Sequence, residues 1–146
     1  MASTKYLNSF FPIRWFSLIN GNTLNSLFNT LQGSVEDGIT AHAGGTKAAA
    51  YQLTATISRI SVAASSSDSV ILPTPSFVGQ ILQVINDGAN PIQIFGKNSD
   101  TIDGVATATG VALTNADRAF FTCTGVTLAS PNPIYAWRSQ LGTKSS

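Results

Sequence analysis

The predicted fold class is decided by two stretches of sequence, Asp68-Ser-Val-Ile-Leu-Pro73 and Gly79-Gln-Ile-Leu-Gln-Val-Ile-Asn-Asp-Gly-Ala-Asn-Pro-Ile-Gln-Ile-Phe95. In both, short runs of apolar and β-branched residues are bounded by Pro, Gly, Asn and Asp, which favour turns. This composition is typical of short β-strands. Neither stretch carries a catalytic motif, so the pattern predicts a rigid β module that acts through its surfaces.

The second stretch predicts a β-hairpin. Residues 81–85 (Ile-Leu-Gln-Val-Ile) form a nearly continuous apolar run, which indicates a central strand covered on both faces. Asn86–Pro91 has the composition of a turn, and the return strand begins at Ile92.

Strand signals continue on both sides of this hairpin. Tyr51–Val62 is rich in β-branched residues, but its alternation slips between Ile57 and Ile60. Such a slip suggests a bulge or a strand covered on both faces. Arg118–Thr124 and Ile134–Arg138 alternate more regularly, as strands with one buried face do.

This alternation predicts which side chains share a face. Ala119, Phe121 and Cys123 fall on one face of their strand, and Tyr135 and Trp137 share a face of the last strand. About seven or eight short strands are expected in all. The sequence therefore predicts a mainly β protein, namely a single antiparallel β-sandwich or barrel of jelly-roll type with an N-terminal arm.

The arm is predicted to span residues 1–37, ahead of a β domain over residues 38–146. One short helix is expected at about residues 23–32, because apolar residues recur there with helical spacing. Asn22 is suited to cap its start and Gly33 its end. The apolar stripe consists of Leu24, Leu27, Phe28 and Leu31. A helix of about 11 residues is marginal in isolation, so the stripe should be buried against the β domain or another subunit.

Four aromatic residues precede this helix: Phe10, Phe11, Trp15 and Phe16. They exceed what a short segment needs to pack one helix, and aromatic side chains are common interface anchors. The eight apolar residues of the arm are therefore candidate contacts with another protein or another subunit. The alternative is that the aromatic residues cover an open end of the β domain.

The composition of the chain argues against two classes of partner, nucleic acids and membranes. Of the 146 residues only 10% are charged, the net charge is +1, and the basic residues are scattered. Nucleic-acid binding needs clustered Lys and Arg, so no nucleic-acid partner is expected. The apolar N-terminal run is interrupted by Pro12 and Arg14 and is shorter than the about 20 residues of a membrane span. No membrane association is expected either.

No set of residues predicts catalysis or a bound metal or cofactor. His42 is the single histidine and lies among small residues, which favours a loop or strand end over a general base. Cys123 is the single cysteine, and its neighbours predict a buried small hydrophobe. Asp100 and Asp103 are expected to serve a tight turn and local backbone hydrogen bonds rather than act as paired acids. We therefore expect no catalytic, metal-binding or cofactor-binding residue, and no enzyme activity.

Five pieces of the chain occur in an order that resembles small structural proteins of tailed bacteriophages, particularly capsid decoration (cement) proteins and related head or fibre modules. The pieces are Gly38-Ile-Thr-Ala-His-Ala-Gly-Gly45, Leu53-Thr-Ala55, Asp68-Ser-Val-Ile-Leu-Pro73, Val84-Ile-Asn-Asp-Gly-Ala-Asn90 and Asp100-Thr-Ile-Asp-Gly104. Each is a turn next to a strand, and the specificity lies in their order and spacing over residues 38–124. Residues 1–37 are outside this resemblance.

The resemblance implies a β-rich domain that forms an oligomer, often a trimer, on the outside of an icosahedral head. Its partners would be the major capsid protein and further copies of itself, and it would be made in the host cytoplasm before joining the virion. Two other classes stay open. One is a tail, baseplate or head-fibre module that binds a host surface glycan through exposed aromatic residues such as Trp137. The other is a small hydrolase that uses His42 beside a Ser and an Asp.

Overall fold

The computed structural model describes residues 33–142, and these residues fold into ten β-strands without a helix. The strands are β1 (Val35–Thr40), β2 (Tyr51–Gln52), β3 (Ile57–Val62), β4 (Asp68–Ile71), β5 (Ile81–Asn86), β6 (Ile92–Phe95), β7 (Thr101–Ile102), β8 (Val111–Leu113), β9 (Arg118–Thr127) and β10 (Ile134–Gly142). The predicted helix at about 23–32 lies outside the described residues. β1 begins at Val35, within the stretch that the sequence assigned to the arm.

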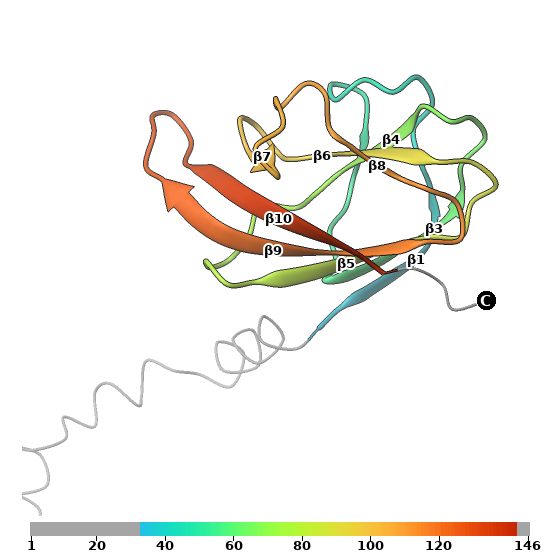
Figure 1. The fold of residues 1–146 in the computed structure, drawn as a ribbon, viewed down its shortest axis with the longest axis horizontal. Coiled ribbons are helices and arrows are strands. Elements are labelled where there is room, and N and C mark those ends of the chain that lie inside the picture. Colours follow the sequence, from blue (N-terminus) through green and yellow to red (C-terminus); the bar gives the residue numbers. More distant parts are fainter. Residues whose placement is uncertain (1–32, 143–146) are drawn as a thin grey trace, which may run out of the picture. The chain divides into compact units, whose positions relative to one another are not determined.

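The strands form two sheets that share one core. The larger sheet has the order β1-β3-β5-β9-β10-β7, and the smaller has the order β2-β4-β6-β8. Figure 1 shows β4, β6 and β8 above the layer of β5, β9 and β10. Ile60 and Val84 of the larger sheet belong to the same buried cluster as Val70 and Ile94 of the smaller sheet. The prediction of a mainly β protein is confirmed.

The prediction of an antiparallel fold is wrong for the first half of the chain. Successive strands alternate between the sheets, so β1, β3 and β5 are parallel neighbours in the larger sheet. In the same way β2, β4 and β6 are parallel neighbours in the smaller sheet. β7 is also parallel to β10, and antiparallel pairing is limited to β5–β9, β9–β10 and β6–β8. The chain therefore coils through both layers before it closes with a long antiparallel pair.

The predicted hairpin over residues 81–95 is also wrong, because β5 and β6 lie in different sheets. The side chain of Asn86 determines the path of the chain after β5. Its side chain is buried, and its Nδ2 donates to the carbonyls of Asn90 (3.0 Å), Leu113 (3.2 Å) and Thr114 (3.1 Å). Its Oδ1 accepts the Gly88 N–H at 3.1 Å. These bonds satisfy the backbone of a connection that crosses between layers, so the chain leaves β5 without folding back beside it.

The predicted strand over Tyr51–Val62 is split between the two sheets as β2 and β3. The crossover buries Leu53 and Ala55. The slip in the apolar pattern has a simple cause, because Ser58 takes an inward, buried position of β3 while Ile57 is only half-buried. An alternating pattern continued across the crossover because residues on both sides of it contribute to the same core.

Predictions for the β9–β10 pair agree with the structure. Ala119, Phe121 and Cys123 are buried on one face of β9, and Trp137 is buried on β10. β5 is central in its sheet as predicted, but Ile81 is 54% exposed, so this strand is not covered on both faces. Its alternating burial shows that the outer face of the larger sheet is open within the described residues.

Asp68, at the start of β4, holds the loop that enters this strand. Its buried carboxylate accepts the N–H groups of Ala64 (2.6 Å) and Ser65 (3.2 Å) and the Ser65 hydroxyl (2.7 Å). The bond from the Ser65 hydroxyl, aided by the backbone bonds, lowers the pKa of Asp68 below its usual value in spite of burial.

We expect Asp68→Asn to lower the free energy of unfolding by about 1–3 kcal/mol at neutral pH, because a charged acceptor of three hydrogen bonds is lost. A lowered pKa in the folded state means that this stabilisation is present above the unfolded-state pKa and is lost as pH falls through the folded-state value. Urea unfolding from pH 7 to pH 3 should therefore show the wild type and the variant converging in acid. The exposed Asp87→Asn is the control and should have a much smaller effect at pH 7. A difference between wild type and Asp68→Asn that persists unchanged to pH 3 would contradict this assignment.

Candidate interaction surface

The eight arm residues that the sequence singled out for an interface lie outside the described residues. They are Phe10, Phe11, Trp15, Phe16, Leu24, Leu27, Phe28 and Leu31. Their role stays a prediction. The candidate surface within residues 33–142 must therefore come from the β domain.

The structure brings His42, Ser69 and Asp68 together. His42 and Ser69 exchange backbone hydrogen bonds of 3.0 and 2.8 Å. However, the buried Ser69 hydroxyl faces the carbonyls of His42 (3.4 Å) and Thr46 (3.5 Å), and the imidazole Nδ1 pairs with the Ala43 carbonyl at 2.7 Å. Among these described residues no side chain of the three bonds another. A hydrolytic triad needs a bond between nucleophile and base, so this arrangement is explained as loop structure.

Asp100 and Asp103 both bond to β10 rather than to local backbone, which corrects the sequence prediction for Asp100. Asp100 Oδ1 accepts the Tyr135 N–H at 2.8 Å, and Asp103 Oδ1 accepts the Ser139 N–H at 3.0 Å. Burial raises the pKa of Asp100, although the Tyr135 N–H opposes the shift. Asp103 also forms the predicted turn, since its φ is 53° and that of Gly104 is 73°. The two carboxylates attach the segments on either side of β7 to the last strand.

Cys123 is buried as predicted, and burial raises the pKa of its thiol, which disfavours the reactive thiolate. Residues 33–142 contain no group of three or more His, Cys, Asp or Glu side chains placed to hold a metal ion. In the same part of the chain, no helix has the length and apolar character needed to cross a bilayer.

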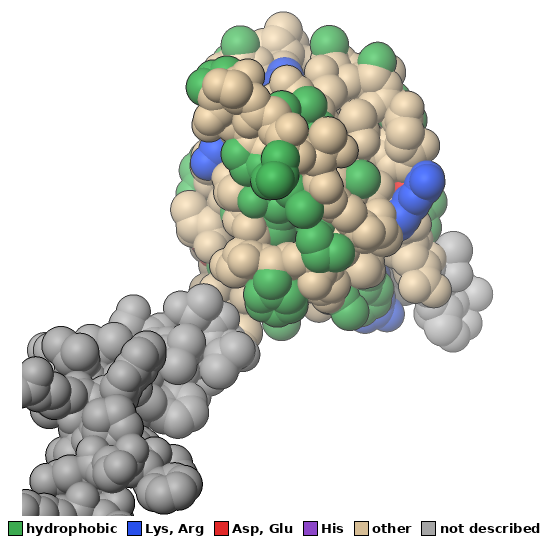
Figure 2. All heavy atoms as spheres, turned by 90° about the vertical axis from the view of Figure 1, so that its left-hand side faces the viewer, with side chains coloured by type: hydrophobic (Ala, Val, Ile, Leu, Met, Phe, Trp, Pro, Cys, Tyr) green, Lys and Arg blue, Asp and Glu red, His purple; other side chains and the backbone are tan. Residues whose placement is uncertain are grey.

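Exposed apolar side chains gather at one end of the β domain. We call this set the apolar end: Phe77, Val78, Ile81, Val126 and Leu128. Each is at least 44% exposed, and Leu128 is 89% exposed. Figure 1 shows the β9–β10 pair projecting to the left, beside the start of β5. Figure 2 views this end directly, with hydrophobic side chains across its centre and lower margin and with Lys and Arg around its periphery.

Backbone hydrogen bonds connect the two segments of the apolar end. The Gly79 N–H donates to the Cys123 carbonyl at 2.7 Å, and the Cys123 N–H donates to the Gln80 carbonyl at 2.9 Å. The loop that carries Phe77 and Val78 is thereby attached to β9 just before its projecting part. Further along β9, Val126 is paired with Tyr135, which packs on the core. Val126 therefore continues the inner face of the larger sheet, whereas Ile81 lies at the start of β5 on the face opposite the buried Leu82.

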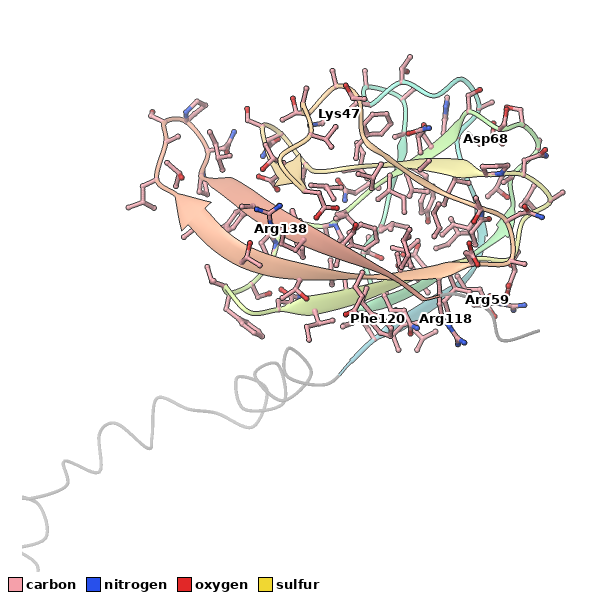
Figure 3. All side chains as sticks on the ribbon, viewed as in Figure 1. Lys47, Arg59, Asp68, Arg118, Phe120 and Arg138 are labelled. Atoms are coloured by element: carbon pink, nitrogen blue, oxygen red, sulfur yellow. The ribbon has the colours of Figure 1, made fainter. Side chains whose placement is uncertain are left out.

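The segments that build the apolar end carry no charge. Residues 72–86 and 119–137 contain no Asp, Glu, Lys or Arg. Charged groups lie outside these two segments. Arg138 follows Trp137 on β10 and pairs with Thr122, the cross-strand partner of Ile81. Farther away, Arg59 forms ion pairs with Asp37 (3.2 Å) and Asp87 (2.5 Å). Figure 3 shows Arg59, Arg118 and Phe120 on the outer side of the larger sheet, away from the projecting hairpin. An uncharged apolar surface loses little hydration energy when another protein covers it.

Sequence reasoning did not identify this surface, although the two uncharged segments were visible in the sequence. Each looks like ordinary strand and turn sequence, and only the fold brings them together. The structure also buries Trp137, which is 1% exposed, so this residue is not available as a platform for a sugar. Comparison of the chain with protein-family models, with curated proteins and with solved structures gave no match.

Proposed function

We propose that the protein is a β-sandwich module that decorates the outside of a bacteriophage head as an oligomer, with the major capsid protein and its own copies as partners. The observation that carries this proposal is the apolar end, an uncharged and exposed surface on a domain of low overall charge. Large apolar surface that is left open usually marks a contact with another macromolecule. Polar groups that could serve chemistry, such as Asp68, Asp100 and Ser69, are engaged in structural hydrogen bonds.

In the proposed mechanism, each rigid module bridges neighbouring coat subunits and so reinforces the shell. A single contact of this kind can be weak. The proposed trimer engages several sites at once, and linkage of this kind raises the total affinity by roughly 10²–10⁴. The residues that precede β1 form the arm in this scheme, and the arm either docks on the shell or connects the subunits.

A tail, baseplate or head-fibre module that binds a host glycan is the alternative. Glycan sites need exposed aromatic platforms, and the residue that the sequence offered for this role, Trp137, lies in the core. Among the described residues the exposed aromatic side chains are Tyr51, Phe77 and Phe120, so one of these would have to take the place of Trp137 as the platform.

The test of the proposed function is deletion of residues 2–20. We expect the shortened protein to bind undecorated capsids at least about tenfold more weakly, because the aromatic anchors of the arm are lost. Co-sedimentation with capsids measures the binding, and sedimentation velocity measures the oligomer. An unchanged thermal unfolding temperature is the control that the β domain is intact. If neither binding nor oligomer size changes, the role of the arm is refuted, and if the full chain does not bind any capsid shell, decoration itself is refuted.

A further inference from the structure

We propose that the apolar end, formed by Phe77, Val78, Ile81, Val126 and Leu128, is a contact between copies of this chain. The inference deepens the proposed function and rests on it for the existence of an oligomer. It assigns association to the β domain and thereby leaves the arm to bind the shell.

The first argument is the amount of apolar surface. From their exposed fractions, the five side chains leave on the order of 500 Å² open, which is at the upper end for a monomer's largest apolar patch. A stable interface buries about 800 Å² on each partner. The five side chains alone supply more than half of this area. The area is therefore appropriate for a specific protein contact.

The second argument concerns charge and identifies the partner as another copy. A charged partner surface would need charges of the opposite sign on the apolar end. Residues 72–86 and 119–137 contain no charged side chain. An uncharged surface is complementary to another uncharged surface, and two copies of the apolar end meet this condition without like-charge repulsion. In a two-fold dimer the same surface of each copy takes part in the contact, and in the proposed trimer the apolar ends of three copies would meet around a three-fold axis.

The third argument is the glycine in the middle of the projecting part of β9. A Cβ added at Gly125 would meet no atom within 4 Å, and its φ is not in the left-handed region. The fold of a single copy therefore does not require glycine at this position, although glycine weakens a strand. Its open backbone permits close approach by a second copy. Gly79 differs, because its φ of 99° itself favours glycine.

The experiment compares the full-length wild type with three single variants by sedimentation velocity over a wide concentration range, without capsids. Leu128→Asp places a charge in the contact, and Gly125→Gln adds bulk without charge. Leu141→Asp is the matched control, because Leu141 is 62% exposed but lies at the far end of β10. We expect a wild-type oligomer that Leu141→Asp preserves. Leu128→Asp and Gly125→Gln should each raise the dissociation constant by at least about 100-fold.

The outcomes separate this inference from the proposed function. A monomeric wild type, or an oligomer that both apolar-end variants preserve, overturns the inference. Circular dichroism and the thermal midpoint establish that the variants are folded, and two chemically different substitutions guard against one that fails to fold. Binding to capsids is measured in a separate experiment. Monomeric variants that still bind the shell, with reduced avidity, support both ideas, whereas a dissociable oligomer that never binds a shell supports the inference and refutes decoration.

Discussion

Replacing Asn86 with Asp is expected to lower the free energy of unfolding by at least about 3 kcal/mol at neutral pH. The substitution keeps the size of the side chain but removes the amide donor. In the wild type this donor serves the carbonyls of Asn90, Leu113 and Thr114 at 3.0–3.2 Å, in a site with no solvent exposure. The variant would place a buried carboxylate against these carbonyl oxygens.

The measurement is urea unfolding followed by fluorescence, at neutral and at acidic pH. In acid the deficit should become smaller, because a protonated carboxyl group can donate one hydrogen bond and carries no charge. Asn132→Asp, in the exposed loop between β9 and β10, is the matched control and should change stability little. A cost for Asn86→Asp no greater than that of this control would show that the turn between the two sheets does not depend on the Asn86 side chain.

Trp137→Ala is expected to lower the free energy of unfolding by about 3–5 kcal/mol, because it leaves a large cavity in the core. Trp137 is 1% exposed, and on β10 it is paired with Cys123 of β9 and Ile102 of β7. It is therefore located where the edge strand, the long antiparallel pair and the shared core meet.

Trp137→Phe separates packing from hydrogen bonding at this position. The indole Nε1 is buried without a hydrogen bond of normal geometry, although the indole is close enough to Asp100 to oppose the rise in the pKa of that carboxyl. If packing dominates, the loss of unfolding free energy in Trp137→Phe should be less than half of the loss in Trp137→Ala, as measured by chemical denaturation. Equal losses in the two variants would instead show that the N–H group contributes most of the stabilisation.

Much of the local structure was predictable from sequence. The strands over residues 81–85, 118–124 and 134–138 were recognised because apolar alternation is a property of neighbouring residues. The Asp103–Gly104 turn was recognised for a similar reason, since both residues tolerate the positive φ that the turn requires. The burial of Cys123 followed from its position within an alternating strand.

The candidate interaction surface was harder to predict from the sequence than the strands were. The sequence pointed to aromatic residues of the arm, which lie outside the described residues, and it did not identify the apolar end. Phe77 and Leu128 are 51 positions apart in the chain. Their segments become neighbours through the pairing of β5 with β9, which the hydrogen bonds between Gly79, Gln80 and Cys123 extend. No pattern within either segment signals this association.

The amino-acid sequence by itself determined that the chain is mainly β, where most strands lie and which residues of β9 face inward. These features depend on side-chain alternation and turn chemistry, which act over a few residues. Only the tertiary structure decided which strands pair, in which direction and in which sheet. The turn at Asn86 illustrates the reason: its composition suits a hairpin, but its side chain bonds carbonyls 27 and 28 residues away and sends the chain into the other sheet. Pairing depends on such distant partners, and they are defined only when the chain has folded.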